Sequence, residues 1–231
     1  MNAEKETNAN LSQTVYDYIM KALLKQEIKC GEKISEENIS ERLNISRTPI
    51  REALRLLASQ GLLVIYPKRF AEVVTFSETD RHQIGIVRLN QDIFSAKLAI
   101  QNGSNADFLN LSRIVDECEK YAKEDDMYMR ITTDCRFHLM LAEIGRNQVH
   151  TAFQQILYQK ICLLQASNYA GVEDSLSKIS HHRQIIEGLM QRDSAATIHA
   201  IVEHLKKFYE LETSDYAFML SYFENESKRG S

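Results

Sequence analysis

The sequence has little of what interrupts helices and nothing long enough to cross a membrane. It contains two prolines, eight glycines and no tryptophan among 231 residues. So few chain breakers favour long helices. No apolar stretch reaches the roughly 18 residues that a membrane-spanning helix needs, and the polar first ten residues lack the basic and apolar parts of a secretory signal. We therefore expect a mainly helical, cytoplasmic protein with no membrane partner.

Cysteine is also scarce, and its spacing argues against a small metal-stabilised or disulfide-stabilised fold. The four cysteines are far apart, at Cys30, Cys118, Cys135 and Cys162. This spacing lacks the close pairs that are typical of structural zinc sites. Isolated thiols fit a reducing compartment better than a disulfide framework. The sequence therefore predicts free thiols.

Charge is low overall but unevenly distributed. The net charge of −4 argues against a chain that coats nucleic acid over its whole surface. Residues 11–75 hold ten basic and eight acidic side chains, whereas residues 76–231 hold seventeen basic and twenty-two acidic ones. A phosphate-binding surface is expected where the balance is positive. Such a surface would therefore lie in the N-terminal third.

Apolar residues at helical spacing predict three helices before residue 62. The first covers about residues 11–28. Ser35 and Ser46 are placed to cap the second and third helices, because serine oxygens accept hydrogen bonds from free backbone N–H groups. Gly61 is placed to end the third.

A two-stranded hairpin is predicted directly after these helices. Residues 62–66 and 71–76 are rich in β-branched and aromatic side chains, and the turn between them carries Lys68 and Arg69. Three helices followed by a basic hairpin describe a winged helix-turn-helix over residues 1–76. In this fold the third helix enters the major groove, while the wing lies along the backbone or minor groove of double-stranded DNA.

The third predicted helix carries a specific motif. Residues 46–57 read Ser-Arg-Thr-Pro-Ile-Arg-Glu-Ala-Leu-Arg-Leu-Leu, and Gly-Leu-Leu follows at 61–63. This string resembles the DNA-reading helix of GntR-family regulators. In that family the arginines and the threonine of this helix contact operator bases and phosphates.

The resemblance implies that Arg47, Thr48 and Arg51 contact DNA here. Arginine suits this role because its planar fork can bind guanine O6 and N7 together. Arg55 either contacts a phosphate or is an ordinary surface residue. The wing tip departs from the family pattern, which usually has glycine where this sequence has Phe70. Phosphate contacts from the two basic residues of the turn, Lys68 and Arg69, remain open.

From residue 77 onward the apolar residues recur only at helical spacing. They predict six or seven antiparallel helices joined by short polar turns, and hence a compact bundle. We therefore expect a mainly α protein, with a DNA-binding domain at 1–76 and an all-helical domain at 77–231.

Four polar side chains of the predicted bundle could share one site. Asp134 and His138 are four residues apart and lie on one helical face. His182 and His204 lie on the apolar faces of consecutive predicted helices, which an antiparallel hairpin would bring together. One carboxylate and three imidazoles suit zinc, nickel or another divalent ion. A histidine on an apolar face is also commonly a hydrogen-bonded core residue, so spacing alone leaves both interpretations open.

A second resemblance concerns these same residues. The segments 134–138, 182–186 and 202–205 resemble the ligand-bearing segments of the FCD sensor domain, which characterises the FadR subfamily of GntR regulators. The resemblance implies that residues 77–231 form an FCD-like effector-binding and dimerisation domain. Many members hold a metal with one Asp and three His, and all four have matches here. Arg88 resembles a position that can face the pocket, where it would pair with an effector carboxylate, or else it forms a surface ion pair. His150 and His199 are expected on the surface.

These observations predict a ligand-responsive transcriptional regulator that is not an enzyme. We expect a homodimer on a two-fold symmetric operator, acting as a repressor, with a small organic acid bound at or near a zinc or nickel ion. One alternative is a metal-dependent, hydrolase-like enzyme that uses the Asp and His residues to activate water, although no general base or nucleophile accompanies them. Another is a structural metal with a fatty-acyl or amino-acid effector.

Overall fold

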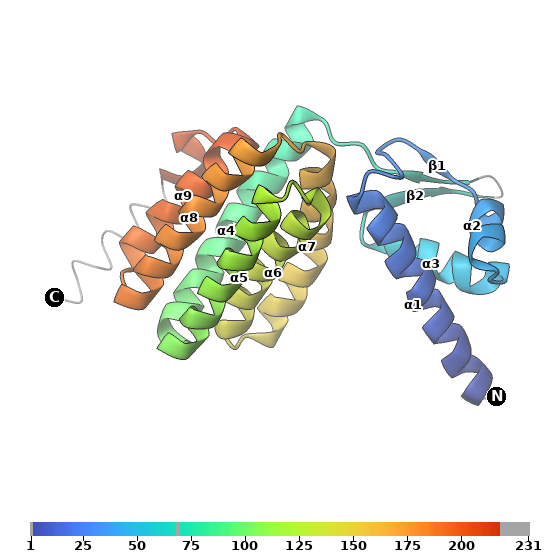
Figure 1. Ribbon diagram of the computed structural model, residues 1–231, viewed down its shortest axis with the longest axis horizontal. Helices are drawn as coiled ribbons and strands as arrows, with labels where there is room; N and C mark the ends of the chain where they lie inside the picture. Colours follow the sequence, from blue (N-terminus) through green and yellow to red (C-terminus); the bar gives the residue numbers. More distant parts are fainter. Residues whose placement is uncertain (1, 68–69, 218–231) are drawn as a thin grey trace. The chain divides into compact units, whose positions relative to one another are not determined.

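The computed structural model describes residues 2–67 and 70–217 (Figure 1). They divide into two compact units. One holds the residues up to 76 together with 159–168, and the other holds 77–158 together with the residues from 169 on. The chain is mainly helical, as the sequence predicts.

The helices of the first unit are α1 (Asn2–Leu24), α2 (Glu36–Leu43) and α3 (Arg47–Ser59). Helix α2 begins where predicted, because the side chain of Ser35 accepts a hydrogen bond from the backbone N–H of Asn38. Ser46 precedes α3 but makes no such side-chain bond. Helix α3 ends before Gly61, which has φ of 71° and continues the chain into the hairpin.

A three-stranded antiparallel sheet completes this unit. Its strands are β1 (Lys33–Ile34), β2 (Leu63–Tyr66) and β3 (Phe70–Val73), in the order β1-β3-β2. The hairpin β2–β3 is the predicted wing. The sequence analysis did not predict β1, which pairs with β3 at residues 33–34 and 71–72. A strand of two residues is too short to show the alternation of apolar and polar side chains that identifies strands in a sequence.

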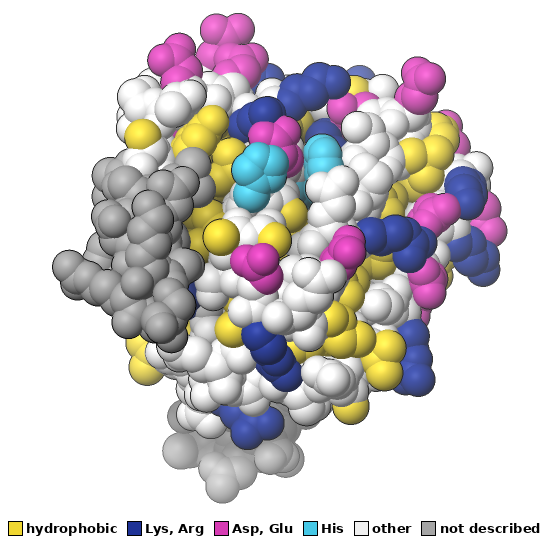
Figure 2. Space-filling model, turned by 90° about the vertical axis from the view of Figure 1, so that its left-hand side faces the viewer, with side chains coloured by type: hydrophobic (Ala, Val, Ile, Leu, Met, Phe, Trp, Pro, Cys, Tyr) yellow, Lys and Arg dark blue, Asp and Glu magenta, His cyan; other side chains and the backbone are white. Residues whose placement is uncertain are grey.

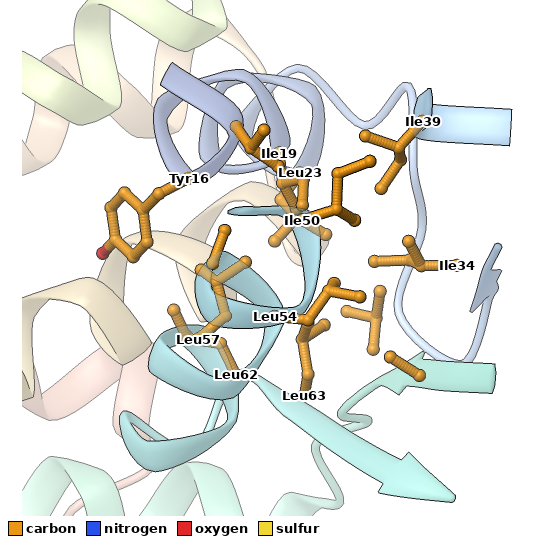
Figure 3. Close-up of a cluster of buried hydrophobic side chains, with 14 of the residues drawn as sticks. Tyr16, Ile19, Leu23, Ile34, Ile39, Ile50, Leu54, Leu57, Leu62 and Leu63 are labelled. Carbon is orange, nitrogen blue, oxygen red and sulfur yellow. The ribbon is translucent and has the colours of Figure 1, made fainter. Parts of the chain in front are cut away.

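Apolar side chains from every element of the first unit meet in one core (Figure 3). Ile19 from α1 and Ile50 and Leu57 from α3 are completely buried. Each such side chain stabilises the fold by roughly 1.5–3 kcal/mol relative to its exposed state. Leu163, from the segment 159–168, belongs to the same core. This packing fixes the face that α3 turns outward.

The second unit is built from long helices. They are α4 (Glu78–Asn102), α5 (Asn105–Lys123), α6 (Met127–Ile144), the first part of α7 (Gln148–Ser167), α8 (Val172–Gln191) and α9 (Ser194–Tyr209). Ser77 and Ser104 begin α4 and α5 with capping boxes, in which serine and an aspartate three residues later satisfy each other's backbone N–H groups. Helices α8 and α9 approach so closely at Gly188 that a Cβ atom there would lie 2.4 Å from Thr197 Oγ1. This contact fixes the two helices that carry His182 and His204.

Two further expectations concern thiols and membranes. Cys30 and Cys118 are free thiols, but Cys135 and Cys162 are disulfide-bonded, so the prediction of free thiols throughout is wrong. Both bonded residues are buried on long helices, where sequence spacing carries no information on pairing. Within residues 2–67 and 70–217, no helix combines the length and apolar character needed to cross a membrane.

Charged side chains of both signs lie on the face of the molecule that Figure 2 shows. On the face in Figure 2, acidic and basic side chains alternate between scattered hydrophobic atoms. The described side chains on this face therefore do not form a single-sign patch of the kind that attracts nucleic acid by charge alone.

Candidate DNA interface and metal centre

The outward face of α3 carries the residues predicted to contact DNA. Arg47, Arg51 and Arg55 follow one another at four-residue steps, so they share a face, and all three are exposed together with Thr48. The opposite face, which includes Ile50, packs in the core. With α2 and the hairpin, these arginines surround a cleft of about 620 Å³, which we call the α3 cleft. It is lined by Ser35, Glu36, Glu37, Arg47, Arg51, Leu54, Arg55, Ile65, Tyr66, Pro67, Phe70 and Ala71.

Two acidic residues from the first turn of α2 face these arginines. The Nε atom of Arg51 lies 2.9 Å from Oε2 and 3.1 Å from Oε1 of Glu36. The contact between Arg47 and Glu37 is longer, at 3.7 Å between Nη2 and Oε1. Sequence analysis missed both acids, because they belong to a different helix.

Phe70 packs within the hairpin. Its ring centroid is 4.9 Å from that of its cross-strand partner Tyr66, and Lys33 Nζ lies 4.3 Å from the ring centroid. Phe70 stands where the family usually has glycine, and its ring packs against side chains of its own sheet. The other two predicted contacts of the wing, Lys68 and Arg69, lie outside the described residues.

The second unit brings the four predicted metal ligands together. We call them the Asp/His cluster: Asp134, His138, His182 and His204, each buried and each offering a ligand atom within 4.8 Å of the others. Helix α6 carries the first two, while α8 and α9 carry one each. His182 Nε2 lies 3.3 Å from Nε2 of both His138 and His204, and 3.5 Å from Asp134 Oδ1. The Nε2 atoms of the three histidines therefore converge on one point.

The Nδ1 atoms of two of these histidines contact oxygen atoms outside the cluster. His138 Nδ1 lies 3.2 Å from Asp92 Oδ2, which is a charge contact without hydrogen-bond geometry. His204 Nδ1 lies 3.3 Å from the backbone oxygen of Lys178. The backbone oxygen beside His204 and the carboxylate beside His138 both favour a proton on Nδ1, so that the Nε2 lone pairs face the cluster.

Burial keeps His182 and His204 neutral, and neighbouring charges keep Asp134 ionised, as binding of a divalent metal requires. Burial lowers the pKa of His182 to about 3 and lowers that of His204 well below its usual value, so both imidazoles are neutral at pH 7. Burial alone would raise the pKa of Asp134, but His182, His138 and Arg130 outweigh it and hold that pKa below its usual range. Neutral imidazoles beside an ionised carboxylate form a ligand set that suits zinc or nickel.

Arg88 lies beside the cluster and is buried, so its alternative assignment to a surface ion pair is wrong. Its Nε atom donates to Tyr158 Oη at 3.2 Å and to Asp92 Oδ2 at 3.3 Å, and its Nη1 donates to Tyr209 Oη at 3.0 Å. Its Nη2 lies 2.8 Å from His138 Nε2. Because guanidinium only donates, the Nε2 lone pair of His138 accepts this hydrogen bond, and a metal bound to that atom would have to displace Arg88 Nη2. An effector carboxylate at Arg88 would have to replace one of these partners.

Several polar residues around Arg88 were not predicted. Asp92 is one helical turn after Arg88 on α4, and Gln154 Nε2 and Tyr158 Oη donate to its Oδ1 at 3.2 and 2.7 Å. His150 was expected on the surface but is buried, with Nε2 2.7 Å from Ser95 Oγ. His199 is exposed as expected. The four-residue spacing of Arg88 and Asp92 was the one signal available, since the other unpredicted partners lie on α7 and α9.

A winged helix-turn-helix joined in one chain to an all-helical unit is the architecture of a two-domain DNA-binding regulator. Residues 11–73 match the family described as bacterial regulatory proteins, gntR family. Residues 87–207, more than half of the chain, match the FCD domain. The chain therefore belongs to the GntR family and carries an FCD domain.

Relatives of similar length support this assignment. The chain is 24% identical over 192 residues to the uncharacterized HTH-type transcriptional regulator YdhC of Bacillus subtilis, covering 82% of this chain and 85% of YdhC. It is also 24% identical to the HTH-type transcriptional repressor RspR of Escherichia coli, over 89% of this chain and 92% of RspR. The solved structure of E. coli McbR/YncC shares the fold, with a TM-score of 0.75 at 20% identity over 85% of this chain and 94% of McbR.

The family settles the class of the protein. It is a transcriptional regulator and not an enzyme, and the comparisons lend no support to the hydrolase-like alternative.

Proposed function

We propose that this protein is a homodimeric, ligand-responsive repressor whose operator affinity changes when a small carboxylic acid binds at a metal in the FCD domain. The observation that carries the proposal is the Asp/His cluster, because it places four metal-ligand atoms in the same chain as the α3 cleft. The name of RspR as a repressor supports repression over activation.

The Asp/His cluster would hold the metal through one carboxylate oxygen of Asp134 and the Nε2 atoms of the three histidines. Zinc and nickel accept this ligand set. A metal bound there would supply Lewis-acid chemistry to an oxygen atom of the acid. The residues of the chain contribute burial and fixed ring orientations, the latter from Asp92 and from the backbone of residue 178.

Helix α4 connects the metal centre to the DNA-binding unit along the chain. It begins at Glu78, a few residues after β3, and carries Arg88 and Asp92 to the Asp/His cluster. An acid that alters the contacts of these two residues acts on the helix that follows the wing. The resulting change in operator affinity is limited by the preference of the acid for one state over the other.

The proposal is tested by adding mono-, di- and sugar acids to metal-loaded and chelator-stripped protein. We expect one class of acid to raise the melting temperature only of the loaded protein, because a ligand at a hundred times its Kd stabilises the folded state by about 2.7 kcal/mol. The same acid should release DNA selected from a random duplex pool. If acids act equally without metal, or not at all, the metal-anchored sensor is wrong. Acid-dependent recruitment of DNA would instead indicate activation.

The homodimer has a candidate interface on α4 and α7. Large apolar side chains at four- and seven-residue spacings are 43–70% exposed there: Val87 and Phe94 on α4, and Val149, Phe153 and Ile156 on α7. The ring of Phe94 packs against His150 of α7 at 4.9 Å between centroids, which joins the two rows into one face. A second copy of this chain would bury this face, as a two-fold operator requires.

Phe153→Glu is expected to shift the protein towards monomers. Burial of each Phe153 side chain contributes about 1.5–3 kcal/mol to the free energy of dimerisation, and a two-fold interface contains two of them. Light scattering after gel filtration measures the mass, and Leu109→Glu is the matched control because Leu109 is 52% exposed on α5, away from this face. A Phe153→Glu protein with the mass of the wild type would exclude this interface.

A further inference from the structure

The hydrogen bonds of Arg51 leave the end of its guanidinium available. Its Nε atom donates to Glu36 at 2.9 and 3.1 Å, bridging both carboxylate oxygens. Within the part of the chain that the structure describes, no hydrogen bond is made by Nη1 or Nη2 of this arginine. These two groups are the pair that binds guanine O6 and N7 side by side. The Nη1 and Nη2 groups of Arg51 are thus available to contact a base, while Glu36 holds the Nε atom of the same side chain.

Glu36 is fixed well enough to hold an arginine. It is the first residue of α2, directly after Ser35, whose side chain caps the helix. A carboxylate is favoured at this position by the partial positive charge of the helix N-terminus. Its side chain is 33% exposed, whereas that of Arg51 is 55% exposed and lines the α3 cleft.

We propose that Glu36 is a positioning residue that orients Arg51 for a guanine of the operator and so determines sequence specificity. The proposal rests on the DNA contact assigned to α3. An arginine without this partner samples many rotamers and must be ordered when it binds, so pre-ordering favours the one geometry that fits the base edge. The carboxylate also repels phosphates, which weakens binding to all DNA equally. Glu36 therefore lowers non-specific affinity and raises discrimination.

The neighbouring pair separates these two effects. Glu37 has the same charge and belongs to the same helical turn, and its Oε1 is 3.7 Å from Arg47 Nη2, beyond hydrogen-bond distance. Its side chain is 69% exposed and that of Arg47 is 60% exposed. Glu37 thus repels phosphate as Glu36 does, but it does not fix the orientation of its arginine.

The test compares Glu36→Ala, Glu37→Ala and Arg51→Ala by fluorescence anisotropy on selected operator DNA, operators with single substitutions, and random duplex. We expect both glutamate variants to bind random duplex roughly threefold more tightly, because each removes one negative charge facing phosphate. Only Glu36→Ala should also lose discrimination, by about tenfold and at a single guanine position, the position that Arg51→Ala also ceases to read.

The Glu36→Ala and Arg51→Ala effects on that guanine should be non-additive in the double variant, because they remove one shared interaction. Melting temperatures establish that the variants are folded, and Glu36→Gln, which keeps the side-chain size, replaces Glu36→Ala if the latter is not. Equal discrimination by Glu36→Ala and Glu37→Ala would overturn the positioning role. Unchanged operator binding by Arg51→Ala would instead overturn the α3 contact itself.

Discussion

Arg51→Ala is expected to weaken operator binding by at least about thirtyfold. A bidentate arginine–guanine contact contributes about 1–3 kcal/mol of discrimination, and a dimer on a two-fold operator makes it twice. Arg51 presents its fork from an exposed face of α3 whose opposite face is fixed in the core. Anisotropy titrations with labelled operator measure the loss, at one fixed salt concentration because phosphate contacts depend strongly on salt.

Two controls separate the base contact from charge. Arg51→Lys keeps the positive charge but loses the planar fork, so it should retain binding to random duplex and lose most of the operator preference. Lys21→Ala removes an exposed positive charge from α1, which does not line the α3 cleft, and should leave operator preference unchanged. Operator affinity within a factor of two of wild type for Arg51→Ala would remove this residue from the interface.

The first unit was predictable where its signals are local. Ser35, Gly61 and the apolar spacing of α3 each mark a boundary or a face through residues close in sequence, and the structure has these features. Strand β1 was missed because its two residues are strand only through pairing with β3. The contact between Glu36 and Arg51 was missed because it joins residues fifteen apart on two helices, for which no periodicity provides a signal.

The second unit shows the same division. Helical faces and the hairpin of α8 and α9 indicated that the four members of the Asp/His cluster could meet, and the resemblance to the FCD domain implied that they are ligands. The residues that orient it were not. Asp92 contacts Arg88 and His138, and Tyr158 contacts Asp92 from α7, so their roles depend on how α4, α6 and α7 pack together. A polar side chain is buried where hydrogen-bond partners surround it, and sequence spacing does not reveal partners that come from other helices.

His204→Ala is expected to abolish most of the stabilisation that zinc or nickel gives to the protein. The variant removes one of four ligand atoms in a buried cluster, while the apolar neighbours on α9 remain. A hundredfold loss of metal affinity lowers the stabilisation by about 2.7 kcal/mol when metal is well above its Kd. The measurement is the difference in melting temperature between metal-loaded and chelator-stripped samples of the same variant. A loss of packing lowers both temperatures and does not change their difference.

Asp92→Asn tests whether the ring of His138 is held by its neighbour. The amide keeps the size of the carboxylate but removes the charge 3.2 Å from His138 Nδ1, so metal affinity should fall by about 10–100-fold with all four ligands intact. The stripped variant should also melt earlier, because Arg88 loses its buried counter-charge. His199→Ala, on the exposed side of α9, is the matched control and should bind metal as the wild type does. If His204→Ala and His199→Ala respond equally to metal, the cluster is a hydrogen-bonded core and effector sensing must rest on other residues.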